Sequence, residues 1–400
     1  MRIKINIETL IIFIFVITAT LLNPLFDNIF IQYIDEMFMI FAIMRIFIKY
    51  KKRIKNNNRN MQLFRSTILY LIIIAIVGVI SNANSGLVGI QAIIIDLIGM
   101  IKAPIVFIYV ACICSDVTKK KTSKILRIIA QIYILIVFLF GVINLVTDIG
   151  MSYDVRYGIR TYEFIYRNPA ALNEVIFCFL GVIYKEVKNK YILLLYSLCA
   201  IITVLLTLRG AALGLVVIFI YLFIVMKKNK NFKLKVSHII IGVIGVCVVA
   251  KNQFVEYFME ESPRSLMLRN SIIVLKKYFP LGAGFATYGS DQAFKNYSPL
   301  YSLFGYNNIY WLSKEGGYAA NDNFWPMIIG QFGCVGIIIY IYILVNQFRF
   351  VMKNKVGKNE KLIQIVLFTL LIISSVGNAI FTSVSGMLIY VFIALLMKDE

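Results

Sequence analysis

The chain has 400 residues, of which 60% are hydrophobic and only 15% charged, a composition outside the range of soluble globular proteins. Its 7 prolines and 24 glycines are too few for a linker or a collagen-like polymer, and its many isoleucines and phenylalanines exclude a disordered chain. A net charge of +21 is typical of nucleic-acid-binding proteins, but here the 41 lysines and arginines lie in short clusters between long apolar runs, which argues against that class.

Long apolar windows dominate the chain. A bilayer core takes about 20 apolar residues as a helix, because lipid cannot satisfy open backbone hydrogen bonds. The first window could be taken for a signal peptide, since Thr18-Ala19-Thr20 is a small-residue site, but the windows that follow favour an uncleaved signal anchor. The predicted spans are 8–26, 29–48, 66–84, 87–114, 125–146, 169–187, 190–208, 211–226, 236–252, 323–348, 362–378 and 380–397.

The distribution of basic residues predicts the orientation. With the N-terminus inside, the short cytoplasmic segments hold 28 of the 41 lysines and arginines, and the outer segments hold 11. We therefore expect one all-α polytopic membrane domain over 1–400, with about twelve spans, a large extracytoplasmic loop and both termini in the cytoplasm. The outer connections are unequal, and the two long ones cover 147–168 and 253–322.

The first outer loop, 147–168, combines arginines with tyrosines. On a helix, Arg156, Arg160 and Arg167 would share one face. Cations on the outer side oppose the orientation rule, so two interpretations remain: tyrosine anchoring with solvated arginines, or a surface that binds an anionic, sugar-bearing ligand. The interleaved tyrosines are Tyr153, Tyr157, Tyr162 and Tyr166.

A helix is predicted to start directly after this loop. Asn168 is placed to cap it, with Pro169 in its first turn. Glu174 then lies about one turn inside the span, where an unpaired charge is costly, so we expect it to pair with Arg167 or Arg209.

The segment 190–226 is too long for one crossing and must fold back. The only candidate turn is Arg209-Gly210 in LTLRGAALG, which predicts an arginine at the outer tip of a tight helical hairpin. Arg209 could interact with lipid head groups, but a fixed guanidinium is better suited to binding a diphosphate, because its planar fork matches phosphate oxygens.

The large outer loop begins with an amphipathic helix, predicted over 262–279 on the outer surface and starting at Ser262-Pro263. Its cations include Arg264 and Arg269, and a turn with Pro280, Gly282 and Gly284 follows. The predicted apolar stripe is Leu268, Ile272, Leu275 and Phe279.

The rest of this loop is rich in aromatic rings. They could stack on sugar rings or pack the loop itself. The loop closes with Asn321-Asp322-Asn323 above a span that begins at Trp325-Pro326, where Asp322 could be only a helix cap. The rings are Tyr288, Tyr297, Tyr301, Tyr306, Tyr310, Trp311 and Tyr318.

Few ionisable groups lie inside the predicted spans. Lys102 could face an internal cavity, or it could form an interhelical ion pair. The six cysteines and the lone His238 show no metal-ligand spacing, and no phosphate-binding glycine loop is present, so the sequence predicts neither a metal nor a nucleotide cofactor.

Three motifs in order resemble the O-antigen polymerase / O-antigen ligase superfamily of bacterial polysaccharide assembly. LTLRGAALG resembles the small-residue arginine element of the family, with Leu208 where serine is common. SPRSLMLRNSIIVLKKYFPLGAGF resembles the opening of the large outer loop, without its aromatic residue, and NDNFWPMIIGQFGCVG resembles the closing element. The topology match covers essentially the whole chain, and the motifs cover about 60 residues.

The resemblance implies a metal-independent, lipid-linked glycosyltransferase, similar to a GT-C helical bundle, in the bacterial cytoplasmic membrane with its active face outside. Such an enzyme polymerises undecaprenyl-diphosphate-linked oligosaccharide repeat units into capsule, exopolysaccharide or O-antigen. Its implied partners are these lipid-linked oligosaccharides, the bilayer, a flippase and chain-length regulator proteins.

Carried over by position, Arg209 and Arg264 would hold the diphosphate, and Asp322 would act as general base with Glu315 as substitute. Second-tier contacts to the substrate would come from Arg160, Arg167, Lys102 and Arg269. Two alternatives remain open: a ligase of the same superfamily that transfers glycan to another acceptor, and a lipid-linked-oligosaccharide flippase or other transporter.

Overall fold

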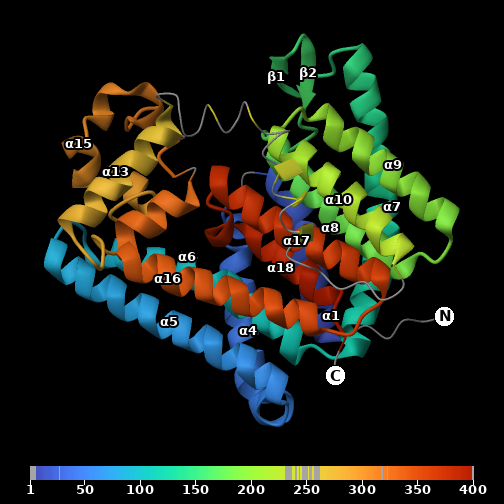
Figure 1. Ribbon diagram of the computed structural model, residues 1–400, viewed down its shortest axis with the longest axis horizontal. Coiled ribbons are helices and arrows are strands. Elements are labelled where there is room, and N and C mark those ends of the chain that lie inside the picture. Colours follow the sequence, from blue (N-terminus) through green and yellow to red (C-terminus); the bar gives the residue numbers. More distant parts are fainter. Residues whose placement is uncertain are drawn as a thin grey trace.

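The computed structural model describes residues 6–26, 28–229, 262–316, 319–321 and 323–398, with a few positions between 237 and 255. The chain is mostly helical, with one small β-hairpin (Figure 1). The main elements are α1 (Ile7–Ile17), α4 (Ile34–Lys49), α5 (Asn58–Ser85), α6 (Ile90–Ile108), α7 (Asp116–Val146), β1 (Ser152–Arg156), β2 (Ile159–Tyr162), α8 (Pro169–Glu186), α9 (Lys190–Leu206), α10 (Gly210–Lys228), α13 (Pro263–Lys277), α14 (Asp291–Lys295), α15 (Pro299–Leu303), α16 (Phe324–Lys353), α17 (Lys358–Gly377) and α18 (Val384–Leu395).

Several helices have the length and composition of membrane spans. In the described part of the chain, seven are long and apolar enough to cross a membrane: Ile7–Leu25, Asn58–Ser85, Ile90–Ile113, Asp116–Val146, Gly210–Lys228, Phe324–Lys353 and Lys358–Gly377. Two shorter apolar helices, α9 and α18, accompany them. The described chain is therefore mostly helical, with helices that could cross a membrane, which confirms the coarse part of the predicted fold. The predicted span 236–252 lies largely outside the described residues.

Hydrogen bonds between helix ends define one end of the bundle, which we call the basic end. Asn6, before α1, donates to Thr118 at the start of α7 over 3.1 Å. The Lys185 ammonium at the end of α8 donates to the carbonyl of Leu395 at the end of α18 over 2.5 Å. The starts of α1 and α7 therefore lie together, as do the ends of α8 and α18.

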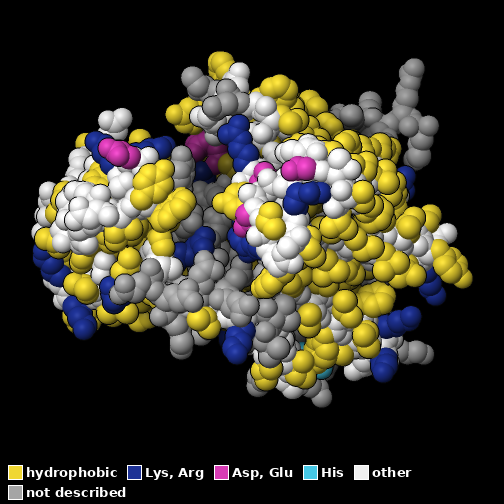
Figure 2. Space-filling model, turned by 90° about the horizontal axis from the view of Figure 1, so that it is seen from above, with side chains coloured by type: hydrophobic (Ala, Val, Ile, Leu, Met, Phe, Trp, Pro, Cys, Tyr) yellow, Lys and Arg dark blue, Asp and Glu magenta, His cyan; other side chains and the backbone are white. Residues whose placement is uncertain are grey.

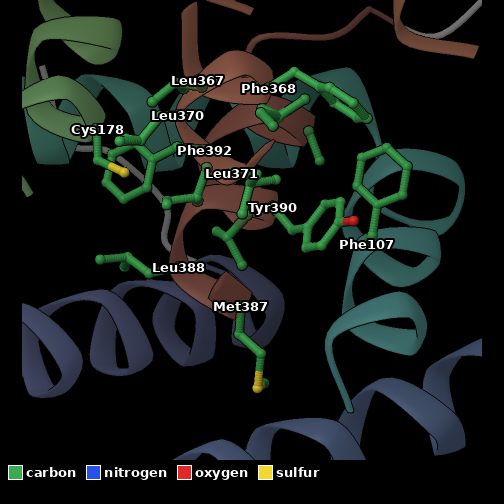
Figure 3. Packing of buried hydrophobic residues seen from close by; sticks show 14 of the residues in the cluster. Phe107, Cys178, Leu367, Phe368, Leu370, Leu371, Met387, Leu388, Tyr390 and Phe392 are labelled. Carbon is green, nitrogen blue, oxygen red and sulfur yellow. The ribbon is translucent and has the colours of Figure 1, made fainter. Parts of the chain in front are cut away.

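Helix α18 forms the centre of the bundle, and every residue from Gly386 to Leu395 is buried. Figure 3 shows its side chains between α17, α8 and α6, with Leu371, Cys178 and Phe107 around it. The rings of Tyr390 and Phe107 lie 5.0 Å apart. A helix that is apolar on nearly all sides is stable where other helices or lipid surround it.

The opposite end, which we call the loop end, carries two lobes. The hairpin lobe consists of α7 to α10 with β1 and β2, and the tyrosine lobe consists of residues 262–316 with α13 to α15 (Figure 1). Residues of the tyrosine lobe form a second apolar core, separate from that of the bundle. Figure 2 looks onto this end and shows basic and acidic side chains around the hollow between the lobes.

Candidate functional site

The first outer loop is a β-hairpin, so the prediction that its arginines share a helical face is wrong. Strands β1 and β2 pair antiparallel, with Val155 opposite Arg160. Tyr157 and Gly158 connect them with φ of 53° and 77°, the positive values that a two-residue hairpin turn requires. Alternating polar and apolar residues on either side of a Tyr-Gly pair were the signal for this hairpin in the sequence.

The hairpin arginines have different surroundings. Arg160 donates to the carbonyl oxygens of Asn144 at 3.0 Å and Leu145 at 3.3 Å, so its guanidinium caps the end of α7. Arg156 donates to the Asp154 carboxylate over 2.9 Å. Arg167 is exposed beyond the hairpin. Arg160 therefore has a structural role, and Arg167 is the more accessible of the two predicted contacts.

The predicted turn at Arg209 is confirmed. Helix α9 ends at Leu206 and α10 begins at Gly210, with Leu208 at φ 48° between them. The turn is held to α8 because the Asn173 amide donates to the Thr207 hydroxyl over 3.1 Å. The Arg209 guanidinium lies 5.2 Å from the centre of the Tyr153 ring in β1, so the turn and the hairpin are in contact.

Two carboxylates of the hairpin lobe lie in the field of Arg209. Partial burial would raise the pKa of Asp154, but hydrogen bonds from Thr161 and Arg156, with the charges of Arg156 and Arg209, hold it below the usual range. Burial and the Asp154 charge raise the pKa of Glu163, although Arg209 opposes this. A carboxylate with a raised pKa beside a cation suits proton transfer.

Glu163 is a candidate that sequence reasoning missed. Its Oε2 atom is buried and makes no hydrogen bond to any described residue. Its backbone N–H donates to the Met151 carbonyl over 3.0 Å, which fixes the residue at the edge of the hairpin. The helical interpretation of 147–168 concealed this position, because it did not place Glu163 near Arg209.

Glu174 does not form the predicted arginine pair. The predicted cap is confirmed, since the Asn168 side chain accepts from the Ala170 N–H and Pro169 occupies the first turn. Glu174 is buried, and its Oε1 atom accepts from the Ser374 hydroxyl of α17 at 3.3 Å. Near it, α8 and α18 line a small cavity of about 190 Å³ that includes Ser385.

Helix α13 starts as predicted but buries a different face. Ser262 forms a capping box with Ser265, and Pro263 is the first helical residue. The buried residues are Met267, Asn270, Ser271 and Val274. In the predicted stripe, Ile272 and Phe279 are 44% and 70% exposed and Leu268 and Leu275 are half-buried, because another face packs on α16 and on the tyrosine core.

The glycine turn after α13 inserts between α5 and α16. The N–H groups of Ala283 and Gly284 donate to the carbonyls of Gly330 and Gln331, each over 2.8 Å. These carbonyls are available because α16 kinks at Gly333, where φ is 59° and ψ −149°. At Gly284, with φ 96°, a β-carbon would lie 2.5 Å from the Asn82 side chain, so only glycine fits.

Polar side chains of α5 and α6 hold the same turn. Asn82 accepts from the Phe285 N–H at 2.8 Å and donates to the Phe285 carbonyl at 2.9 Å. Asp96 accepts from the Ala286 N–H at 2.6 Å and from the Gln331 amide at 3.0 Å. The tyrosine lobe is therefore anchored to the bundle through buried hydrogen bonds.

Lys102 forms an interhelical ion pair, the structural one of its two interpretations. Its ammonium pairs with the Asp35 carboxylate of α4 and lies 3.4 Å from Glu36 Oε1. Lys102 is only 8% exposed and Asp35 1%. A contact between Lys102 and a diphosphate at the loop end would require breaking this buried pair.

Most rings of the large loop pack the lobe itself. Tyr288, Tyr301 and Tyr306 are fully buried. The hydroxyls of Tyr288 and Tyr306 form a hydrogen bond of 2.8 Å. Tyr310 and Trp311 are the exceptions, with 63% and 55% of their surface exposed. Among the described tyrosine and tryptophan rings predicted in this loop, these two are therefore placed to stack on a sugar, whereas Tyr318 lies outside the described residues.

The remaining candidates lie in the tyrosine lobe. Arg264 is half-buried in the first turn of α13, and its carbonyl oxygen accepts from the Asn323 amide over 3.4 Å, which links the start of α13 to the start of α16. Arg269 and Glu315 are exposed. Asp322 lies outside the described residues. The structure thus separates Arg209 and Arg264 into the two lobes of one end.

Neither a protein-family model nor a curated protein matches this chain. Within the described residues, no group of three or more His, Cys, Asp or Glu side chains could hold a metal ion.

Proposed function

We propose that the protein polymerises undecaprenyl-diphosphate-linked oligosaccharide repeat units at the outer face of the bacterial cytoplasmic membrane. The supporting observation is the position of Arg209, which occupies a tight turn at the loop end, next to Tyr153 and in the field of Glu163. The guanidinium can bind a phosphate, and a carboxylate within its electrostatic field can accept a proton.

In the proposed reaction, a hydroxyl oxygen of the acceptor sugar attacks the anomeric carbon of the donor. The bond between this carbon and the diphosphate oxygen breaks, and undecaprenyl diphosphate leaves with the electron pair. Arg209 and Arg264 stabilise the charge that develops on the leaving diphosphate, which is the effect that this chemistry needs most. The hydroxyl proton passes to a carboxylate.

Two carboxylates compete for the role of base. Asp322 has this role by resemblance, with Glu315 as substitute. Glu163 is supported by its raised pKa and by an oxygen free of described partners. Tyr310 and Trp311 offer exposed rings for the sugars, and Arg167 and Arg269 offer exposed cations for the diphosphate.

The test is the length of the surface polymer made by cells that carry a single variant. We expect Arg209→Ala and Arg264→Ala to reduce polymer formation at least about 100-fold and to accumulate single lipid-linked repeat units, because removal of one donor to a developing oxyanion typically costs that much. Lys120→Ala, an exposed cation in the first turns of α7, is the matched control.

Polymer of normal length in both arginine variants, at normal protein level, would contradict the proposal. Repeat units trapped on the cytoplasmic side would indicate a flippase instead. Normal polymer that is not transferred to its final acceptor would indicate a ligase.

A further inference from the structure

A polar cavity lies at the basic end, at the other end of the helices from the proposed reaction site. It measures about 700 Å³ and opens between the turn before α5, the first turns of α5, and α16. Lys55 and Arg65 line it, and no aspartate or glutamate does. Both cations are exposed, so they can reorient towards a ligand. An anion is the ligand that such a cavity favours.

Side-chain amides add directed hydrogen-bond donors to these charges. Asn58 and Gln62 line the cavity from α5, and Asn346 lines it from α16. The Asn346 amide nitrogen is buried and has no hydrogen-bond acceptor among the described residues. A buried donor without an acceptor is costly unless water or a ligand satisfies it. A phosphate oxygen would do so.

Apolar side chains of α5 and α16 follow the cavity along these helices, and we call them the apolar track. Leu69 lies at its edge on α5 and Tyr342 at its edge on α16, and both are exposed. These two helices pack side by side along their length (Figure 1). One turn further from the cavity, Ile72 on α5 and Ile338 on α16 are 50% and 70% exposed. Cations followed by apolar side chains match the polarity of a lipid with a charged head.

We propose that this cavity binds the phosphate head group of an anionic phospholipid, whose acyl chains lie along the track between α5 and α16. Basic pockets between helices at the cytoplasmic side recognise such head groups. The site does not depend on the proposed polymerase reaction. Free inorganic phosphate has the same charged group but no acyl chain, so the apolar track distinguishes the two ligands.

The experiment measures binding to the purified full-length protein in a neutral detergent, by isothermal titration or native mass spectrometry. The probes are a short-chain phosphatidylglycerol, the matching phosphatidylcholine, and inorganic phosphate. The test variant is Lys55→Gln with Arg65→Gln. The matched control is Lys51→Gln with Lys52→Gln, which removes two exposed cations of the same turn that do not line the cavity.

We expect phosphatidylglycerol to bind at least tenfold more tightly than phosphatidylcholine, and the test variant to lose about tenfold in affinity while the control keeps it. Asn346→Leu, which keeps every charge, should also weaken phosphatidylglycerol binding. Arg65→Lys in place of Arg65→Gln in the test variant should restore part of the lost affinity. Equal binding of the two lipids, or equal loss in test and control variants, would overturn the site. Inorganic phosphate that binds as tightly as the lipid would overturn the lipid assignment.

Discussion

The two ends of the bundle use the same residue types for different purposes. At the basic end, several cations donate to backbone carbonyls at the C-termini of helices. Arg45 and Lys49 are different, because they pair with the Glu8 carboxylate, and Arg59 also lies 4.4 Å from the centre of the Phe350 ring. The Lys361 ammonium donates to the carbonyls of Val351, Met352 and Asn354 over 2.9, 3.1 and 2.8 Å. The Lys358 ammonium donates to the carbonyl of Met226, and the Arg59 guanidinium donates to the carbonyl of Phe350. These contacts complement the negative end of the helix dipole.

At the loop end, cations and polar groups meet rings, carboxylates and a turn. Arg209 lies over a tyrosine ring, Arg156 pairs with Asp154, and Asn82 binds the glycine turn. Arg160 is the exception, because it caps α7 as the basic-end cations cap other helices. The comparison shows that a count of charges does not reveal which cations are available for a ligand, whereas the contacts of each cation do.

The largest effect is expected where the loop end depends on close backbone packing. Gly284→Ala should lower the free energy of unfolding by about 3 kcal/mol or more, because it adds backbone strain and a clash with Asn82. Gly305→Ala is the control, with φ 69° and no atom within 4 Å of the new carbon, and should cost about 1 kcal/mol. Thermal unfolding in detergent measures both. Equal losses would show that the turn is not tightly packed.

A smaller effect is expected at the basic end. Lys361→Met should destabilise the protein by about 2 kcal/mol, since three carbonyls lose a charged donor. Lys120→Met, which removes an exposed cation, should change stability by less than about 0.5 kcal/mol. Denaturant titration separates the two variants. If both behave alike, the basic-end lysines set orientation alone.

The smallest change concerns the pH dependence of the proposed reaction. A base must be deprotonated, and Glu163 has a pKa raised above its ordinary value of 4.5, mainly by burial. Activity should therefore rise with pH through a midpoint above 4.5 and be lost on acidification below it. Glu163→Gln should reduce activity and abolish this limb, while Asp154→Asn should lower its midpoint by removing a neighbouring negative charge. If Glu163→Gln leaves the pH profile unchanged, the base is Asp322 or Glu315 instead.

The helical class and many helix positions were predictable from apolar windows and caps, because both depend on neighbours in the sequence. The turn at Arg209 followed from the length of the segment 190–226 and from the Arg209-Gly210 pair within it, and the capped start of α8 followed from Asn168 and Pro169. Boundaries were less accurate: α7 begins at Asp116 rather than at 125, since its first turns are polar and project beyond the apolar window.

What failed depended on contacts between distant segments. The apolar positions of α13 allow two faces, and packing on α16 and the tyrosine core decides between them. The partner of Lys102 is 67 residues away on another helix, and spacing within one helix does not reveal it. Glu163 became a candidate only after the hairpin placed it within the electrostatic field of Arg209.

The pairing of Asn82 with Phe285 has a consequence for biosynthesis. The two residues are separated by 203 positions, so at about 5–20 residues per second the partner of the Asn82 side chain is made roughly 10–40 s later. During that interval the end of α5 carries an amide without its final partner, in or near lipid that cannot supply one. Insertion of α5 and completion of its end at the tyrosine lobe are thus separate events in time, and the second waits until the tyrosine lobe has been translated.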